Sequence, residues 1–188
     1  ADGKPISIPP MKNLRDNYQE IVDDAAAGGV PCLVCANIPI ETADQVKAAV
    51  DILGKTAEAA QKAGLVFAYH NHDAEFRPVE GLVPYDHFLS QLPADKVKME
   101  LDLAWCIKSG NDPVALFDKH PGRFPLWHVK DLDKEGKIVP VGAGTIDFKR
   151  IFAAAGKSGM KHFFVEHDFP QDAEASIKAS SKYLRSMI

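Results

Sequence analysis

Cysteine is scarce in this sequence. Three cysteines, Cys32, Cys35 and Cys106, stand among 188 residues. An odd and sparse count does not suit a disulfide framework, so we expect a reducing compartment and a cytoplasmic protein. Cys32 and Cys35 have CxxC spacing, but the surrounding VPCLVCA is typical of a strand. Because residues three apart on a strand point to opposite faces, we interpret both as buried structural cysteines and not as a redox or zinc motif.

Long apolar runs and a basic surface are missing as well. The longest apolar runs are far shorter than the ~20 residues that a membrane span needs. Acidic residues outnumber basic ones by 26 to 22, the net charge is −4, and the two signs are mixed along the chain. Nucleic-acid-binding surfaces usually carry a basic stripe. We therefore expect neither a membrane nor a nucleic acid as a partner.

Hydrophobic residues make up 46%, enough for a core, and we expect one domain over residues 1–188.

The chain does have a regular alternation of helix and strand signals. Predicted helices cover 13–27, 43–63, 84–92, 112–120, 147–155 and 172–187. Predicted strands cover 30–36, 65–71, 97–103, 124–130 and 162–167. Each strand follows a helix, and no hairpin signal separates the strands. This order indicates parallel strands joined by right-handed crossovers.

Two α/β architectures fit this order, a doubly wound sheet and a (β/α)8 barrel. No GxGxxG follows a strand, so the main cue for a dinucleotide-binding sheet is missing. Gly142-Ala143-Gly144 precedes a predicted helix, and we interpret it as a flexible turn.

Polar residues gather where four successive predicted strands end. The four ends read His70-Asn71-His72 with Glu75 beyond, Glu100-Leu101-Asp102 with Trp105 beyond, His128-Val129-Lys130-Asp131, and Glu166-His167-Asp168. In parallel α/β folds chemistry gathers at the carboxyl ends of the strands, and in a barrel these ends converge. Burying several ionisable groups without partners is costly, and a divalent cation offsets that cost. A mixed imidazole and carboxylate set suits Mn2+, Zn2+ or Co2+, so we predict one shared divalent metal site.

Taken singly, these residues also have structural interpretations. Asp102 would cap the turn that follows its strand, and Glu166 would pair with a lysine. Lys130 would lie in solvent. The prediction of a metal site rests on the four strand ends together.

Five motifs carry a resemblance to a known family. YHNHDAEF, ELDLAW, WHVKD, VGAGTIDF and FVEHD resemble the sugar phosphate isomerase/epimerase family of xylose isomerase-like TIM barrels, from about residue 8 to the C-terminus. That family includes D-tagatose 3-epimerases, inosose dehydratase, and lyases or hydratases that act on 3-keto-glycosides. The resemblance implies a (β/α)8 TIM barrel, which takes ~250 residues and eight βα units. This chain supplies about five units, so we expect that the first three are missing.

A partial barrel would expose two sheet edges and part of an apolar interior. We therefore expect that this chain is a fragment of a larger one, or that another chain covers the open side. A homo-oligomer is one form that such an association would take.

The resemblance also implies a ligand set. Ketose epimerases bind one divalent metal through Glu, Asp, His and Glu at successive strand ends. Asp102 in ELDLAW matches the Asp, His128 in WHVKD the His, and Glu166 in FVEHD the last Glu. His70 falls where the epimerases have the first Glu. Either His70 replaces that ligand, or Glu75 reaches the metal from the loop. We favour His70, because it lies on the strand and an imidazole is a competent ligand.

The implied chemistry is proton abstraction next to a carbonyl, with a metal that polarises the carbonyl and stabilises an enediolate. In the epimerases two metal-bound glutamates work on opposite faces of the substrate. Here Glu166 alone is clearly retained, so His70, His72 or Glu75 would supply the second acid or base. Lys130 would support the developing oxyanion.

Trp105 and Asn71 are the predicted substrate-binding residues. Trp105 would offer an apolar face to a sugar ring; the alternative interpretation of Trp105 is a core aromatic.

The leading hypothesis is an isomerase or epimerase of a small-molecule sugar or sugar derivative. Its main alternative is a lyase or hydratase of 3-keto-glycosides at the same site, because YHNHD.EF resembles members associated with oxidised sugars. An endonuclease IV-like nuclease is less favoured, since it uses three zincs and more ligands than these motifs supply. A metal-binding remnant without turnover is the other less favoured alternative.

Overall fold

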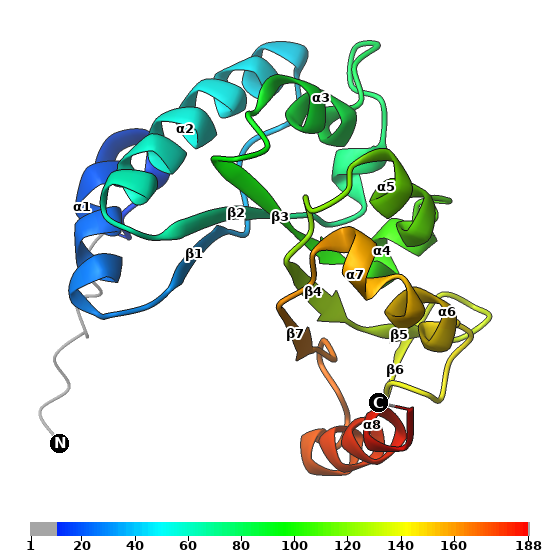
Figure 1. The fold of residues 1–188 in the computed structure, drawn as a ribbon. Coiled ribbons are helices and arrows are strands. Elements are labelled where there is room, and N and C mark those ends of the chain that lie inside the picture. Colours follow the sequence, from blue (N-terminus) through cyan, green and yellow to red (C-terminus); the bar gives the residue numbers. More distant parts are fainter. Residues whose placement is uncertain (1–10, 188) are drawn as a thin grey trace, which may run out of the picture.

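A five-stranded parallel sheet forms the centre of the computed structural model, which describes residues 11–187 (Figure 1). The strand order is β1-β2-β3-β4-β7, the same as the order in the sequence. The sheet comprises β1 (Cys32–Cys35), β2 (Val66–His70), β3 (Val97–Asp102), β4 (Leu126–Val129) and β7 (His162–Val165). A doubly wound sheet reverses its strand order at a switch point, whereas successive βα units of a barrel do not. The (β/α)8-type prediction is therefore confirmed, as an arc of five strands.

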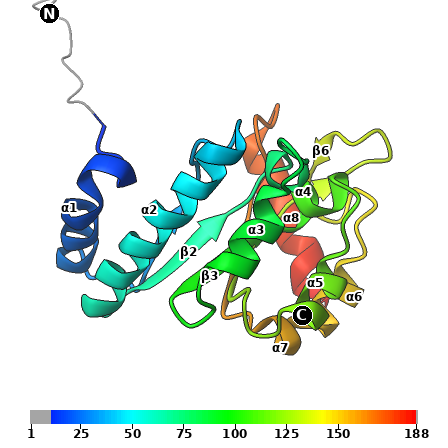
Figure 2. The same cartoon turned by 90° about the horizontal axis from the view of Figure 1, so that it is seen from above.

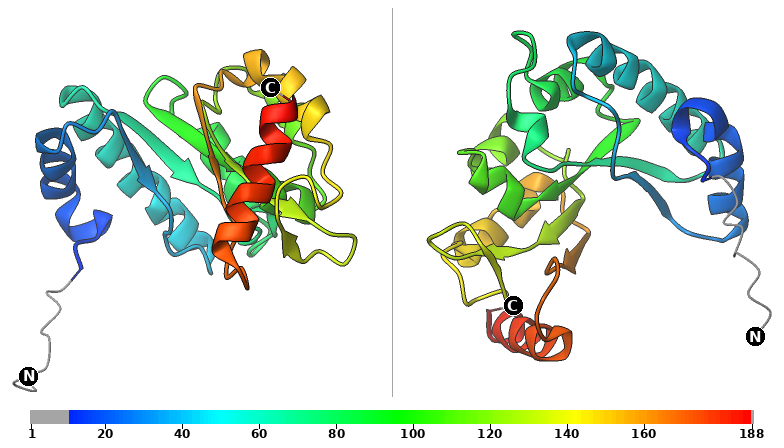
Figure 3. Two further views of the ribbon diagram at one scale, coloured as in Figure 1. Left: turned by 90° about the horizontal axis from the view of Figure 1, so that it is seen from below. Right: turned by 180° about the vertical axis from the view of Figure 1, so that it is seen from behind.

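Helices cover the outer side of this curved sheet, as Figures 1 and 2 show. They are α1 (Leu14–Ala27), α2 (Ala43–Lys62), α3 (Pro84–Gln91), α4 (Leu103–Lys108), α5 (Pro113–Lys119), α6 (Phe148–Ala153), α7 (Ala155–Ser158) and α8 (Ala173–Met187), with a 3-10 turn η1 at Ala74–Phe76. Figure 3 shows the sheet from below and from behind, with β1 and β7 at its two ends. The predicted single domain also includes residues 1–10 and 188, which lie outside the described residues.

Local sequence signals explain where the helices begin and end. Thr42 begins α2 with a capping box: its hydroxyl accepts from the Gln45 N–H, and the Gln45 side chain accepts from the Thr42 N–H, both at 3.2 Å. Gly64 follows α2 with a φ of 79°, a conformation that suits glycine. The predicted strand and helix bounds agree with the structure to within about two residues, except for the segment 147–155.

The alternation of side chains along the strands separates the core from the concave face. Tyr69 of β2 packs against Phe88 of α3 with ring centroids 5.0 Å apart, and Trp127 of β4 stacks on Phe117 of α5 at 5.1 Å. The odd-numbered residues of β2, β3 and β4 thus face the helices and fill the apolar core. Their even-numbered neighbours, including His70, face the other side of the sheet.

Three features differ from the sequence prediction. A short helix, α4, begins directly after β3, because Asp102 caps it. The predicted helix 147–155 is divided into α6 and α7 at Ala154. An antiparallel pair, β5 (Asp131–Leu132) and β6 (Ile138–Val139), lies outside the main sheet where no hairpin was predicted.

Gly142-Ala143-Gly144 lies in a turn, as predicted, but hydrogen bonds hold this turn in place, so it is not the free turn that we expected. The buried Asp131 carboxylate accepts hydrogen bonds from the Gly142 and Gly144 N–H groups at 2.9 and 3.0 Å, and from those of Leu132 and Ile146. A Cβ at Gly144 would collide with Asp131 and with the Leu132 carbonyl. The motif is therefore a close-packed loop that is held by one carboxylate.

The three cysteines are unpaired. Cys35 is buried as predicted, whereas Cys32, which was also predicted to be buried, is only half-buried; Cys106 is buried too. Burial raises the pKa of both Cys32 and Cys35 to about 11, which makes them unreactive thiols and agrees with a structural role.

Within residues 11–187, no helix combines the length and the apolar character that crossing a membrane requires.

Candidate functional site

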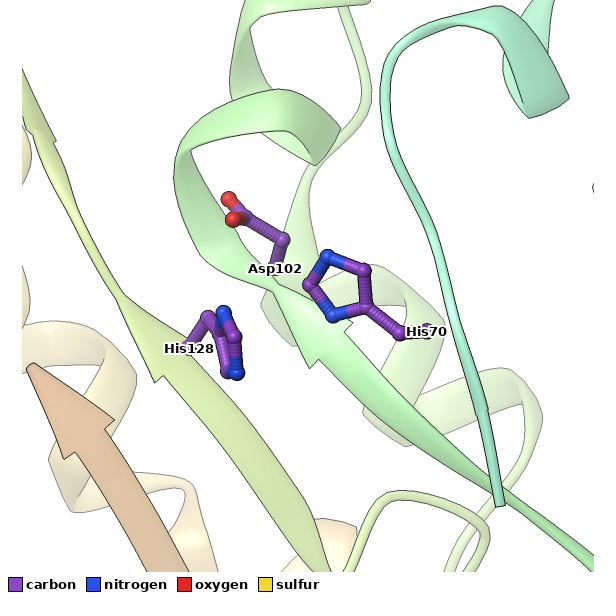
Figure 4. Close-up of side chains that lie close together, drawn as sticks. All are labelled: His70, Asp102 and His128. Carbon is purple, nitrogen blue, oxygen red and sulfur yellow. The ribbon is translucent and has the colours of Figure 1, made fainter. Parts of the chain in front are cut away.

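The carboxyl ends of β2, β3 and β4 bring polar side chains together on the concave face. In the parallel register His70 is paired with Glu100, and Asp102 with His128. Figure 4 shows that His70, Asp102 and His128, which come from three neighbouring strands, lie close together. The predicted convergence of strand ends is thus present in the structure.

His70, Asp102 and His128 form a cluster that could hold a metal ion. Each offers one ligand atom, and these atoms lie within 4.8 Å of one another. His70 Nδ1 and Asp102 Oδ2 are buried and have no hydrogen-bond partner among the described residues. Buried polar atoms without partners are costly, and a cation beside Asp102 Oδ2 would remove that cost for the carboxylate. Two imidazoles and a carboxylate are also a suitable donor set for a divalent transition metal. The residues present therefore fit the predicted metal.

The two carboxylate oxygens of Asp102 have different surroundings. Oδ1 accepts a hydrogen bond of 2.9 Å from the Trp105 N–H and caps α4. Oδ2 lies 3.2 Å from Lys130 Nζ, an ion-pair contact without hydrogen-bond geometry. Burial raises the pKa of Asp102, although Lys130 and the Trp105 N–H oppose this effect. Capping and metal binding are thus compatible, because each uses its own oxygen.

Lys130 is buried, contrary to the interpretation that it lies in solvent. Its Nζ contacts Asp102 Oδ2 at 3.2 Å, Glu166 Oε2 at 3.0 Å and Asp168 Oδ2 at 2.8 Å. It also lies 5.0 Å from the centroid of the Trp105 ring. Burial alone would lower the pKa of Lys130, but the three carboxylates together raise it above its usual range. Lys130 is therefore a fixed positive charge beside the cluster.

Glu166 follows β7 and lies at the edge of the cluster. Its Oε2 is 2.6 Å from His128 Nδ1 and 3.0 Å from Lys130 Nζ, and its side chain is 36% exposed. Burial opposes ionisation, but hydrogen bonds from Lys130 and His128 lower the pKa of Glu166 to about 2. Glu166 is therefore an anion in the neutral range. It contacts His128 but does not belong to the three-residue cluster.

The residues after β2 are mainly tied to the protein itself. Glu75 is buried; its Oε1 accepts from the Tyr69 hydroxyl at 2.7 Å and its Oε2 from the His72 N–H at 2.9 Å. Asn71 Oδ1 accepts from the Asp102 N–H at 3.1 Å, and its Nδ2 donates to the His72 carbonyl. The alternative in which Glu75 is the first metal ligand receives no support, because Tyr69 holds Glu75 on the helix side of β2. The structure brings His70 to the cluster instead.

Trp105 borders a cleft beside the cluster and is not a core aromatic. The cleft has a volume of about 770 Å3 and lies between Trp105, the β5–β6 pair and the segment 167–172. Trp105 is only partly buried, and Lys108 Nζ lies 4.6 Å from its ring centroid. The His72 ring centroid is 6.5 Å from that of Trp105 and 4.9 Å from that of His70. His72 thus lies between the cluster and the indole.

Sequence reasoning placed two further carboxylates, Glu100 and Asp168, at strand ends but gave neither of them a role at this site. Glu100 Oε2 lies 3.2 Å from His70 Nδ1 and 3.3 Å from His128 Nε2. Asp168 makes the shortest of the contacts to Lys130. The signal for Glu100 was present, because the period of two along a strand puts Glu100 on the same face as Asp102.

Comparison with known proteins identifies relatives along nearly the whole chain. The family model described as "Xylose isomerase-like TIM barrel" matches residues 10–187. An inosose dehydratase of Lacticaseibacillus casei is 25% identical over 142 residues, which cover 66% of this chain and 47% of that protein. The chain thus spans about half the length of the curated relatives that it matches.

Solved structures show the same fold. A sugar phosphate isomerase/epimerase from Parabacteroides distasonis ATCC 8503 has a TM-score of 0.81 and 28% identity, over 95% of this chain and 68% of that chain. A crystal structure of the IOLI protein with a bound zinc atom has a TM-score of 0.70 and 19% identity, over 90% of this chain and 67% of that one. The fold extends in both proteins beyond the part that this chain matches.

Proposed function

Because the chain belongs to the xylose isomerase-like TIM barrel family, we propose that it is a divalent-metal-dependent enzyme. It would act on a sugar or sugar derivative by removing a proton next to a carbonyl, with isomerisation or epimerisation as the outcome. The observation that carries this proposal is the cluster of His70, Asp102 and His128, together with the buried Oδ2 of Asp102 that has no hydrogen-bond partner among the described residues. The zinc in the IOLI structure and the description of the Parabacteroides protein support it.

The metal would be held by His70, Asp102 and His128, with Glu166 as the fourth ligand. When bound, the cation would polarise the substrate carbonyl and stabilise the negative charge of the enediolate; Mn2+, Zn2+ and Co2+ suit the donor set. Lys130 would hold a second positive charge beside that oxygen, since Asp102, Glu166 and Asp168 fix its ammonium group.

Proton transfer would use Glu166 and His72. Glu166 is ionised and partly exposed beside the cluster, so its carboxylate is the proposed base. The His72 ring centroid lies 4.9 Å from that of His70, and His72 is the proposed second acid or base. Glu75 is a weaker candidate for that role, because Tyr69 and the His72 N–H occupy both of its oxygens.

Substrate binding is assigned to the cleft beside Trp105. The indole would cover an apolar face of a sugar ring, and the cleft of about 770 Å3 would hold the remainder of the molecule. Asn71 would act indirectly, since its side chain is buried and positions the Asp102 backbone.

The alternative outcome is elimination, as in a lyase or hydratase of 3-keto-glycosides. Epimerisation needs an acid or base on each face of the substrate, whereas elimination needs one base and a proton donor for the leaving group. In the proposed ligand set, His70 stands where the epimerases have a first carboxylate. Glu166 is then the one carboxylate ligand of this set that is partly exposed and could act as a base. Curated relatives named inosose dehydratase also favour this alternative.

Nuclear magnetic resonance in D2O separates the outcomes. Keto sugars and 3-keto-glycosides would be incubated with the chain and Mn2+, Zn2+ or Co2+. Loss of the α-proton signal with unchanged composition supports isomerisation, and release of water or an aglycone supports elimination. Stoichiometric metal without exchange or product would favour a metal-binding protein without turnover. Nicking of abasic DNA would favour the nuclease alternative instead.

We also propose that a second copy of the chain, or a further part of a longer chain, covers the open side of this single domain. β1 and β7 each pair with one strand only within the described residues. Phe164 and Val165 on β7 are 49% and 41% exposed. Unpaired edges with apolar side chains favour association. Solution scattering with mass determination tests this, and a compact monomer of the 188-residue chain would contradict it.

A further inference from the structure

A fourth charged side chain, Glu100, lies directly beside both histidines of the cluster. Its Oε2 is 3.2 Å from His70 Nδ1 and 3.3 Å from His128 Nε2. Glu100 is 6% exposed, so water cannot easily replace either contact. The position follows from the sheet: Glu100 is the register partner of His70 and precedes Asp102 by two residues.

One carboxylate oxygen thus faces one nitrogen of each imidazole. His70 Nδ1 is buried and lacks a hydrogen bond within the described residues, and Glu100 Oε2, 3.2 Å away, is an acceptor within reach of it. His70 Nε2 and His128 Nδ1 are then the nitrogens that remain for a cation. Glu166 Oε2, the proposed fourth ligand, lies 2.6 Å from His128 Nδ1, on that same side of the ring.

The contacts of Glu100 differ from those of the other buried carboxylates. Asp131 accepts hydrogen bonds from four backbone N–H groups, and Glu75 accepts from the Tyr69 hydroxyl and the His72 N–H. These two carboxylates hold loops. Within residues 11–187, no hydrogen bond from a backbone N–H to the Glu100 side chain is present, and its ion-pair contacts are the two imidazoles. A role in holding the backbone therefore does not explain Glu100.

We propose that Glu100 is a positioning residue that accepts the His70 Nδ1–H and the His128 Nε2–H, and so directs His70 Nε2 and His128 Nδ1 to the metal. The inference rests on the proposed function, because it requires the metal site. A metal-ligating histidine commonly donates its second N–H to a carboxylate, which sets the tautomer and strengthens the ligand. Here one carboxylate would do this for two ligands from neighbouring strands. Glu100 itself touches neither the substrate nor the metal.

The first test needs no variant. The 15N-labelled wild-type chain is loaded with Zn2+, and long-range 1H–15N spectra of the imidazoles report which nitrogen of each histidine binds the metal. The proposal requires ligation through Nε2 of His70 and through Nδ1 of His128, with a retained proton on the opposite nitrogen. Ligation through His70 Nδ1 or His128 Nε2 would overturn it.

The second test compares Glu100→Gln with Glu58→Gln. Glu58 is exposed and pairs with Lys96, so this control removes a carboxylate far from either histidine. Glu100→Gln should lower the affinity for Zn2+ by about 10–100-fold, as measured by competition with a chromophoric chelator. Glu58→Gln should bind Zn2+ like the wild type. Thermal denaturation without metal would separate a folding defect from a binding defect. Glu100→Asp keeps the negative charge but has a shorter side chain, and it should also lower the affinity for Zn2+.

Spectra of the Co2+-loaded protein distinguish positioning from direct ligation. Because Glu100 lies outside the ligand set, saturated Glu100→Gln should keep the d–d absorption of the wild type. A changed coordination number would make Glu100 a ligand and overturn the positioning role. Wild-type affinity in Glu100→Gln would overturn the inference alone. A wild-type chain that binds no Zn2+ would overturn the metal site of the proposed function, and the role of Glu100 with it.

Discussion

Asp102 Oδ1 accepts a hydrogen bond of 2.9 Å from the backbone N–H of Trp105, while Oδ2 of the same carboxylate faces the cluster without a hydrogen bond. One side chain therefore ends β3, begins α4 and presents a ligand atom. The division of its oxygens has a direct experimental consequence.

Asp102→Asn should separate the two tasks. Asparagine caps a helix as well as aspartate, so α4 should remain intact, but the negative ligand is lost. Glu166 and Asp168 still neutralise the buried Lys130 in this variant. We therefore expect a melting temperature close to that of the wild type and a larger loss of Zn2+ affinity than in Glu100→Gln. Asp102→Ala should lose the affinity and also about 1 kcal/mol of stability, because the cap is removed. Equal Zn2+ affinity in Asp102→Asn and wild type would exclude Asp102 as a ligand.

His70→Ala and Glu75→Gln should decide the identity of the first ligand. His70 lies in the cluster, whereas Glu75 is occupied by Tyr69 and the His72 N–H. Elemental analysis after dialysis should find metal in Glu75→Gln and a strongly reduced content in His70→Ala. The reverse pattern would show that the loop carboxylate reaches the metal.

The stability of the metal-free protein should fall in acid partly through Glu166. Its folded pKa of about 2 lies below the ordinary value of 4.5, because Lys130 and His128 favour the ionised form. A depressed pKa contributes stability that is present above 4.5 and is lost as the pH falls through about 2. Urea denaturation midpoints should therefore decline less steeply over this range in Glu166→Gln than in the wild type. If the midpoints of the wild type and of Glu166→Gln fell equally with pH, Glu166 would not be a source of the acid sensitivity.

Lys130→Met should be strongly destabilising. Lys130 is 2% exposed and faces three carboxylates, and the Asp102 carboxylate is fully buried. Removal of one partner from a buried ion pair leaves an uncompensated charge, which costs about 3–5 kcal/mol in the free energy of unfolding. Lys157→Met removes an exposed lysine that pairs with Asp118 and should cost about 0–1 kcal/mol. Urea denaturation near neutral pH measures the free energy of unfolding of both variants. Equal losses in the two variants would refute the role of burial.

Gly144→Ala should disrupt the loop that Asp131 holds. The added Cβ would collide with the Asp131 carboxylate and the Leu132 carbonyl, so the hydrogen bonds to Asp131 cannot all persist. Gly156→Ala is the matched control, because its Cβ would meet no atom within 4 Å and alanine favours a helix. Thermal denaturation should show a lower melting temperature for Gly144→Ala and an equal or higher one for Gly156→Ala.

The sequence predicted the repeating part of the fold well. The alternation of apolar residues, the cap at Thr42 and the glycine at position 64 are local signals, and local signals act within a few residues. It failed for α4 and for the β5–β6 pair. α4 depends on an aspartate that also ends a strand, and β5–β6 is held by the distant contacts of Asp131.

The candidate site shows the same division between local and distant contacts. The strand ends predicted a shared site, because parallel strand ends meet at one edge, and the family resemblance singled out His70, Asp102 and His128 as ligands within it. Glu75 was assigned to the same edge from its position near His70. The structure places it against Tyr69 on the helix side, since the turn η1 carries it around the end of β2.

The sequence by itself determined the strands, their parallel order and the face on which each side chain lies, because these follow from a period of two and from helices between strands. Only the tertiary structure decided which side chains touch. The register between β2, β3 and β4 sets Glu100 beside His70 and Asp102 beside His128. No local signal encodes that register, because it results from how the helices pack across the whole sheet. The sequence therefore shows the candidate metal ligands and the face on which Glu100 lies, whereas the contacts of Glu100 with two of these ligands follow from the tertiary structure alone.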